Sequence, residues 1–312
     1  MRNIITQPTP EQLRFPASNG LTIRADFNGG VLSMDLGPLI LGGVDRQIQL
    51  THQMAEAFND PRHPCYIGHR LTDLMAQRVY QIACGYEDAN DANALRKGPL
   101  FKMGVGRTPL EEDQDLASAS TFSRLENAAT SRDLYRLAQV FVDQFIGSYS
   151  KVPEVLVLDM DHSEDETHGQ QEFSFYNHHY RSHCYLPLFL FEGLSGKFIT
   201  AVLRSGKRPK GNENAMIIKR VLKRLRDAWP ETRIILRGDG HFSNPELMQL
   251  ALDDPYTDFI FGMTGNSVLA KLAAPYIDSV GKIYQLRCRH AKQARQTIPK
   301  RTRTYHEVEY AA

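Results

Sequence analysis

The stretches Val155-Leu-Val-Leu-Asp-Met-Asp161 and Ile234-Ile-Leu-Arg-Gly-Asp239 decide how this chain folds. Each is an apolar run of strand length that ends on an aspartate. A carboxylate at the end of a buried strand is costly unless a cation or a hydrogen-bond donor pairs with it. Two such ends suggest that Asp161 and Asp239 share one site, most simply a site for a divalent metal ion.

The sequence between these stretches predicts a mixed sheet. Arg181–Glu192 and Lys197–Leu203 have the apolar and aromatic content of strands, and Leu194-Ser-Gly196 supplies a hairpin turn between them. Asn212–Trp229 changes to helical periodicity, with apolar residues on one face and basic residues on the other. Thr232–Leu236 follows as the fourth strand. The order strand, hairpin, strand, helix, strand predicts an α/β fold with one crossover, which should be right-handed.

Composition and charge set the next limits. The chain has 312 residues, enough for one large or two ordinary domains, and its net charge of +1 neither indicates nor excludes a nucleic-acid partner. The charge is uneven, because residues 279–306 contain no acidic residue. The basic residues of this segment are Lys282, Arg287, Arg289, Lys292, Arg295, Lys300, Arg301 and Arg303. The segment favours a polyanion partner, and the alternative is a solvated, partly disordered tail.

Several protein classes are disfavoured. The cysteines Cys65, Cys84, Cys184 and Cys288 are far apart and form no Cys-x-x-Cys pair, which argues against a zinc knuckle or a disulfide framework. The N-terminus has no basic start followed by an apolar stretch, so no secretory signal is indicated. No apolar run approaches the ~20 residues that a membrane span needs. We therefore expect a cytoplasmic protein with no membrane partner.

The first half of the chain predicts mainly helices after an extended start over residues 1–17. The expected elements are a hairpin of Leu21–Phe27 and Val31–Leu36 around Asn28-Gly-Gly30, helices over Gln47–Phe58, His69–Tyr86 and Asp88–Lys97, a loop over Gly98–Asp115, and a helical region from Ser120 to Gly147. Ser148–Pro153 is the candidate domain boundary. It divides the chain into a mainly helical region, residues 1–150, and an α/β region, residues 151–312.

Five stretches together carry a resemblance to a known family. They are Gly85-Tyr-Glu-Asp-Ala-Asn-Asp-Ala-Asn-Ala-Leu-Arg96, Leu125-Glu-Asn127, Leu158-Asp-Met-Asp161, Thr167-His-Gly-Gln-Gln171 and Ile235-Leu-Arg-Gly-Asp239. In this order they resemble bacterial insertion-sequence transposases of the DDE domain group 1 family, from about residue 20 onward. The resemblance implies an RNase H-like catalytic domain, a helical N-terminal region for DNA binding and assembly, and cut-and-paste transposition of double-stranded DNA.

The resemblance also implies roles for individual residues. In an RNase H-like sheet the first and fourth strands lie side by side, so Asp161 and Asp239 would meet and hold Mg²⁺ or Mn²⁺. Asp159 shares the strand face of Asp161 and is expected nearby. The family pattern places a hydroxyl residue two positions after the metal aspartate, and Ser163 therefore favours Asp161 as the primary ligand.

Supporting residues keep two interpretations each. His168 and Gln171, within the resembling stretch, either position DNA or brace a loop. Arg237 either contacts a phosphate or forms a structural ion pair. The basic residues Lys282, Arg287, Arg289, Lys292 and Arg295 are expected to contact DNA.

The C-terminal part departs from the family pattern. The third metal ligand of the family is a glutamate on a helix well downstream of the second aspartate. Here Phe259–Met263 predicts a strand and Ser267–Leu272 a helix, the chain then passes through Ile283–Cys288, and the alternation around Glu307 and Glu309 is typical of a strand. We therefore expect a C-terminally truncated chain with a weak two-aspartate metal site. We also expect an uncovered edge or face of the sheet that favours self-association.

Two other functions remain open. One is a catalytically silent DNA-binding protein derived from a transposase. The other is a metallohydrolase, because Asp159, Asp161, His162, His168, His178, His179 and His183 fall within 25 positions and His241 follows Asp239. Mixed His and Asp ligands suit zinc or manganese. The histidines lack the tight spacing of a helical zinc motif, however, which argues against this alternative.

Overall fold

A mixed sheet forms the centre of the molecule. The computed structural model describes residues 12–18, 20–25, 36–109, 115–263 and 265–310. Within them, a five-stranded sheet has the order β8-β7-β3-β9-β10. Its strands are β3 (Val155–His162), β7 (Leu188–Glu192), β8 (Phe198–Val202), β9 (Arg233–Gly238) and β10 (Thr257–Phe261). β3, β7 and β8 are antiparallel neighbours, while β9 and β10 run parallel to β3. This is the RNase H-like arrangement, and the predicted α/β fold is confirmed.

Alternation along β3 explains how the sheet is packed. Leu156, Leu158 and Met160 are buried on one face, whereas Asp159 is half-buried and Asp161 is exposed on the other. The buried face packs against the predicted crossover helix, α8 (Gly211–Ala228), and against α9 (Pro245–Leu252), whose N-cap is Asn244. Each fully buried Leu or Ile in such a core stabilises the fold by about 1.5–3 kcal/mol.

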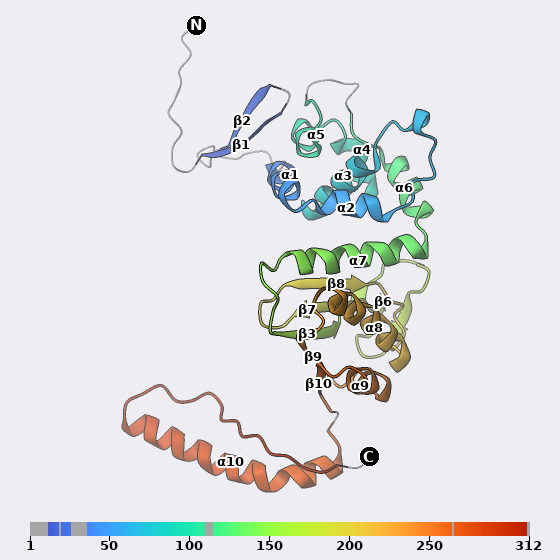
Figure 1. Ribbon diagram of the computed structural model, residues 1–312. Helices are drawn as coiled ribbons and strands as arrows, with labels where there is room; N and C mark the ends of the chain where they lie inside the picture. The colour runs from blue at the N-terminus through green and yellow to red at the C-terminus, as the bar shows by residue number, and fades with distance from the viewer. Residues whose placement is uncertain (1–11, 19, 26–35, 110–114, 264, 311–312) are drawn as a thin grey trace.

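The helix α7 (Ser131–Gly147) joins the sheet to the helical region above it in Figure 1. A capping box between Thr130 and Asp133 begins this helix. Phe145 of α7 packs into the core of the sheet, and Val140 packs into a cluster of the N-terminal helices. The Thr200 hydroxyl of β8 donates to the Ala138 carbonyl at 3.0 Å. α7 thus contributes to both hydrophobic cores.

The N-terminal helices agree with the sequence in part. They are α1 (Gly37–Ile48), α2 (Leu50–Ala57), α3 (Leu71–Ala83), α4 (Ala92–Leu95), α5 (Pro99–Val105) and α6 (Ala119–Ala128), with short 3-10 turns at Pro64–Tyr66 and Ala89–Asp91. The helices predicted around α2, α3, α4, α6 and α7 are confirmed. The loop expected over Gly98–Asp115 is wrong at its start, because α5 lies there, and α1 was not predicted.

Glycine explains why α1 and α5 escaped prediction. A Cβ at Gly42 of α1 would lie 2.4 Å from the Gly104 carbonyl oxygen, and one at Gly104 of α5 would lie 2.7 Å from the Pro38 carbonyl oxygen. Only glycine lets the two helix backbones approach this closely. In the sequence the same residues read as helix breakers, because the partner helix that requires them is not visible there.

Two small β elements complete the fold. β1 (Leu13–Ser18) and β2 (Leu21–Ala25) form an antiparallel hairpin, in which Gly20 has a φ of +79°. The predicted turn at residues 28–30 and most of its second strand lie outside the described residues. A separate sheet has the order β4-β6-β5, formed by Asp165–Glu166, Ser182–Tyr185 and Phe175–Asn177. The single strand predicted over Arg181–Glu192 is therefore two strands, separated at Leu186-Pro187.

The C-terminal part differs most from prediction. The helix expected at Ser267–Leu272 continues to residue 293 as α10 (Ser267–Gln293), capped by Asn266, and so includes Ile283–Cys288, for which no element was predicted. Residues 296–310 run back along α10 without strand structure, which also corrects the strand expected around Glu307 and Glu309. The rings of Tyr276 and His306 stack at 4.1 Å. In Figure 1, α10 lies apart from the sheet.

Candidate functional site

Asp161 and Asp239 lie at neighbouring strand ends. The register of the parallel pair β3 and β9 places Met160 beside Gly238, so the next residues, Asp161 and Asp239, continue the two strands side by side. Both aspartates are exposed, and the Asp239 side chain retains 59% of its accessible surface. A Cβ on Gly238 would lie 2.6 Å from the Phe242 ring, so glycine is required where β9 turns into this loop.

The turn after β9 fixes the direction of Asp239. Its Oδ1 accepts from the His241 backbone N–H at 2.9 Å, and its main-chain oxygen accepts from the Phe242 N–H at 3.1 Å. This is an Asx-type turn, which holds a carboxylate at a strand end without burying it. The His241 ring lies 3.5 Å from Asp239 Oδ2. Asp239 therefore stays largely exposed to solvent, with His241 beside its second oxygen.

Asp159 is engaged by a cation of the protein itself. Both of its carboxylate oxygens accept from the Arg237 guanidinium, and this contact raises the pKa of Arg237. The two residues are cross-strand partners on β3 and β9. Gly193 packs against the pair, since a Cβ there would lie 2.6 Å from Asp159 Oδ2. Of the two interpretations of Arg237, the structure displays the ion pair, which occupies the oxygens that Asp159 would offer to a metal.

His162 lies directly behind the aspartates, on the buried face of β3. Its ring stacks on Phe242 with 4.8 Å between ring centroids and 3° between ring planes. Burial, together with the positive charge of Arg204, lowers the pKa of His162 to about 4, although a side-chain hydrogen bond with Asn214 acts in the opposite direction. His162 is therefore a neutral, buried ring at neutral pH, unlike a solvent-exposed histidine.

A cavity of about 710 Å³ opens beside Asp239. Its walls come from the end of β5 and the following turn, the loop before α8, and the turn after β9. The lining residues are His162, Tyr176, Asn177, His178, His179, Tyr180, Leu186, Gly206, Lys207, Arg208, Pro209, Asp239, Gly240 and His241. Its volume falls within the ~300–1,000 Å³ typical of small-ligand sites.

The sequence analysis missed most of these lining residues. A signal was present in the run Tyr176-Asn-His-His-Tyr180 and in the basic run Lys207-Arg-Pro-Lys210. Each run alone is typical of a polar surface loop. Their combination at one cavity depends on the small sheet of β4, β5 and β6, whose short strands give little periodic signal.

The other predicted supporting residues lie in two places, the segment between β4 and β5 and the C-terminal helix α10. His168 and Gln171 are exposed between β4 and β5, where Gln171 Nε2 donates to the His168 carbonyl at 3.4 Å. This contact corresponds to the loop-bracing interpretation. Lys282, Arg287, Arg289 and Lys292 project from α10, and Arg295 follows its end. The structure does not bring this basic group to the aspartate site, because α10 lies apart from the sheet (Figure 1).

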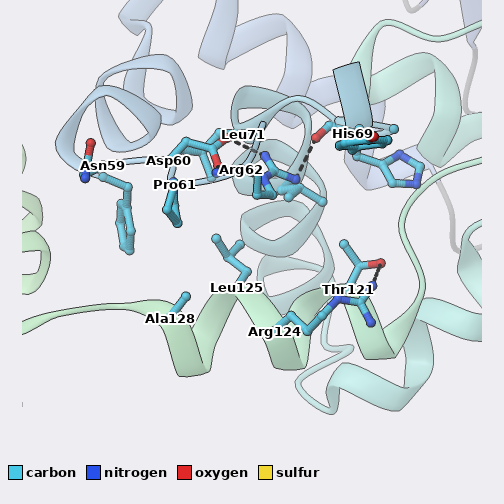
Figure 2. A pocket seen from close by; sticks show the side chains of 14 residues that line it. Asn59, Asp60, Pro61, Arg62, His69, Leu71, Thr121, Arg124, Leu125 and Ala128 are labelled. Carbon is cyan, nitrogen blue, oxygen red and sulfur yellow. Dashed lines mark hydrogen bonds and ion pairs between the residues drawn. The ribbon is translucent and has the colours of Figure 1, made fainter. Parts of the chain in front are cut away.

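A second cavity, of about 500 Å³, lies in the helical region (Figure 2). Leu71 of α3 and Leu125 of α6 form part of its apolar wall. Its arginines are already used by neighbouring groups: Arg62 binds Asp60 and the His69 carbonyl, and Arg124 donates to the Thr121 hydroxyl at 3.1 Å. This cavity belongs to the packing of α3 and α6 and contributes no residue to the aspartate site.

The donor set at the strand ends fits Mg²⁺ or Mn²⁺. Mg²⁺ takes hard oxygen ligands and is commonly held by one or two carboxylates together with water and substrate phosphates. Asp161 and Asp239 supply two exposed carboxylates of this kind. Among the described residues, no group of three or more His, Cys, Asp or Glu side chains is placed to hold a metal ion.

None of the helices in the described part of the chain is both long and apolar enough to cross a membrane.

Comparison of the chain with known protein families gives a match over most of its length. Residues 15–312 match the model of the family described as transposase DDE domain group 1. No curated protein matches the chain.

Similar solved structures include two transposase complexes. A piggyBac transposase synaptic complex with hairpin DNA shares 14% identity, over 74% of this chain and 52% of that one, with a TM-score of 0.37. The Drosophila P element transposase strand transfer complex shares 10% identity, over 69% of this chain and 48% of that one, with a TM-score of 0.25. The chain thus spans about half the length of these solved proteins.

Proposed function

Because the chain belongs to the transposase DDE domain group 1 family, we propose that it catalyses metal-dependent cleavage and transfer of DNA strands at the ends of an insertion sequence. The observation that carries this proposal is the placement of Asp161 and Asp239. They continue the adjacent parallel strands β3 and β9 at one end of an RNase H-like sheet. Two exposed carboxylates at this position suit hard divalent cations.

The residues of the site divide the work. Asp161 and Asp239 would hold Mg²⁺ or Mn²⁺. When bound there, such ions would supply activation of the attacking oxygen and stabilisation of the leaving oxygen in an in-line displacement at phosphorus. The Asx turn at His241 holds Asp239 in place, and the Arg237–Asp159 pair cross-links the same two strands one step away from the site. These contacts keep the two strand ends, and thus the two carboxylates, at a fixed spacing.

DNA is the proposed partner. The α10 residues Lys282, Arg287, Arg289 and Lys292 provide positive charge within residues 279–306, which contain no acidic residue, and phosphate contacts of this kind supply much of the affinity for DNA. We assign residues 1–150 to DNA binding and assembly and residues 151–312 to catalysis, with α7 packed against both. Self-association of two chains and a cytoplasmic location fit the proposal.

A second candidate function is DNA binding without cleavage. It is favoured by the finding that the described residues gather no group of three metal-ligating side chains. A two-carboxylate site binds metal weakly, because a third carboxylate would add both a ligand and charge for a second ion. Such a chain would still recognise DNA through its basic surface.

Strand cleavage distinguishes the two candidates. The assay uses DNA that carries the ends of the chain's own element, Mg²⁺ or Mn²⁺, and the full chain. We expect cleavage that is lost in Asp161→Asn and retained in Asp258→Asn, because Asp258 is an exposed carboxylate paired with Arg233 and lies two strands from Asp161. Unchanged DNA binding with no cleavage in the wild type would establish the second candidate instead.

A further inference from the structure

The cavity beside Asp239 has walls of three different chemical kinds. Aromatic and histidine rings come from β5 and the turn that follows it. Positive charge comes from Lys207 and Arg208 in the loop before α8, and Asp239 closes the side toward the metal-binding carboxylates. A molecule in this cavity therefore lies next to the residues proposed to carry out the reaction. Its chemistry can be inferred from the walls.

The aromatic wall offers a flat, accessible ring. Tyr176 is 48% exposed. The rings of His178 and His183 meet it at 84° and 67°, with centroids 5.1 and 5.4 Å away. Edge-to-face neighbours fix the orientation of a ring while leaving part of its surface open. An exposed aromatic ring of this kind can stack on any nucleobase, because every base has a π-face.

The basic rim suits the phosphates of a nucleic-acid strand. Lys207 and Arg208 are exposed at the cavity, and Lys207 Nζ is positioned 4.1 Å from the centroid of the Phe175 ring. Lys and Arg bind phosphate through charge-assisted hydrogen bonds. Rings beside fixed cations are the combination that single-stranded nucleic-acid sites use.

The floor of the cavity contains polar side-chain atoms. His162 is 8% exposed, and neither of its ring nitrogens makes a hydrogen bond of normal geometry with the described residues. The side chain of buried Asn214 is the polar group that lies within reach of this ring. The edge of a nucleobase carries both donors and acceptors, which an imidazole can pair with.

We propose that this cavity holds one unstacked nucleobase of the DNA strand that enters the aspartate site. The base stacks on Tyr176 and turns its polar edge toward His162, and Lys207 and Arg208 bind the adjoining phosphates. This inference rests on the proposed function, since it names which part of the DNA occupies the wall beside Asp239. It also assigns Tyr176 as a substrate-binding residue outside the carboxylate pair.

Abasic scanning tests the proposal. The full chain is titrated, with Ca²⁺ in place of Mg²⁺, against a 20-bp duplex carrying a four-nucleotide single-stranded overhang, and each overhang base is removed in turn. Base–aromatic stacking implies that removal of one particular base weakens binding about tenfold. Tyr176→Ala should abolish this sensitivity, whereas Tyr176→Phe should retain it.

Tyr256→Ala is the matched control. Tyr256 is 44% exposed and precedes β10, at the opposite end of the parallel strands from Asp239. This variant should remain as sensitive to base removal as the wild type. Equal affinity of the wild type for all abasic duplexes would overturn the inference, while binding of the blunt duplex would leave the proposed function standing. Failure to bind any of these DNA molecules would overturn both.

Discussion

At the residue scale, the site depends on how each carboxylate is satisfied. Three acidic residues on β3 and β7 have three different environments: Asp161 is free to solvent, Asp159 is paired with Arg237, and Glu192 is buried. Buried or paired carboxylates act as braces because their oxygens are already occupied. Only an exposed carboxylate at a strand end is free to bind a metal ion.

Glu192 is the brace with the most contacts. Its side chain is 2% exposed and accepts hydrogen bonds from the backbone N–H groups of Val157, Leu194 and Ser195 and from the Ser195 hydroxyl. Burial by itself would raise the pKa of Glu192, but these hydrogen bonds outweigh it and hold the pKa below its ordinary value. Glu192 thus fixes the β7–β8 turn to β3, next to Asp159.

The lowered pKa of Glu192 predicts a pH-dependent contribution to stability. Because the folded state binds this proton less tightly than the unfolded state, the stabilisation is present above the ordinary carboxyl pKa and is lost as the pH falls through the lowered value. We expect Glu192→Gln to reduce the free energy of unfolding at pH 7 by about 1–3 kcal/mol. Urea unfolding at pH 7 and below pH 4 measures this.

Glu164→Gln is the control for Glu192, because Glu164 is an exposed carboxylate that accepts a hydrogen bond from the Ser182 hydroxyl. Its replacement should change stability little at either pH. The assignment of Glu192 as a brace would be wrong if both variants lost the same stability, or if the loss in Glu192→Gln persisted unchanged at low pH.

The sequence predicted the residues of the site that obey a simple period. Asp161 and Asp239 were found because each ends an apolar strand. An ion pair of Arg237 was one of two interpretations, but its partner, Asp159, was not predicted, because it depends on the register between β3 and β9. Glu192 was not foreseen, because its partners are backbone N–H groups of a turn and of the neighbouring strand. Every residue other than proline has a backbone N–H group, so the residue types do not show which of these groups Glu192 binds.

At the element scale, the two helices that the sequence missed meet through glycine. Gly42 lies where α1 crosses α5, whereas its neighbour Gly43 points elsewhere. A Cβ added at Gly43 would lie 4.0 Å from Arg46 Nη2, which is an ordinary contact distance. Substitutions at these two adjacent residues therefore distinguish the effect of close helix packing from the effect of helix propensity. One of them is required by the crossing of the helices, and the other is only a weak helix former.

We therefore expect opposite effects from two neighbouring substitutions. Gly42→Ala should destabilise the protein by about 1–3 kcal/mol, because its Cβ would lie 2.4 Å from the Gly104 carbonyl oxygen and force the helices apart. Gly43→Ala should leave stability unchanged or raise it by up to about 1 kcal/mol. Thermal unfolding of both variants provides the measurement. Equal destabilisation would contradict the assigned helix crossing.

α10 is much longer than the helix predicted from the sequence. Ile283-Tyr-Gln-Leu-Arg-Cys288, for which no element was predicted, continues a helix that begins at the Asn266 cap. Short apolar runs fit both periods, and only the length of the element separates them. Ile283 and Leu286 lie with the chain that folds back over residues 296–299. Their apolar character thus serves a local contact rather than the main sheet.

The helical form of α10 gives a specific test of DNA binding. Lys282→Gln together with Arg287→Gln removes two charges without breaking the helix. If both residues contact phosphates, the slope of log affinity against log salt should fall by roughly 2, at ~0.9 per phosphate. Filter binding or fluorescence anisotropy at several salt concentrations measures this slope.

A matched pair of charges controls for the total charge of the protein. Lys219 and Lys223 are exposed on α8, and Lys223 pairs with Asp227. Replacing these two lysines with Gln should leave the salt slope near that of the wild type. An equal decrease of the salt slope in both double variants would show that the basic residues of α10 make no specific phosphate contacts.

At the scale of the whole molecule, the sheet has one covered and one open face. The core of α7, α8 and α9 covers the face of Leu156 and Leu158. On the face that carries Asp159 and Asp161, Phe191 is 39% and Ile260 is 59% exposed. The uncovered edge or face that the sequence analysis expected from a truncated chain stays a prediction. The proposed metal site lies on this open face, where DNA can reach it.

The central claim is that Asp161 and Asp239 together bind a divalent metal ion at the ends of β3 and β9. Titration calorimetry with Mn²⁺ tests it most directly, on the wild type and on Asp161→Asn, Asp239→Asn and the control Asp258→Asn, with circular dichroism to verify that each variant is folded. The account predicts Mn²⁺ binding by the wild type and by Asp258→Asn, and none by either of the other two variants. Unchanged Mn²⁺ binding by folded Asp239→Asn would contradict it.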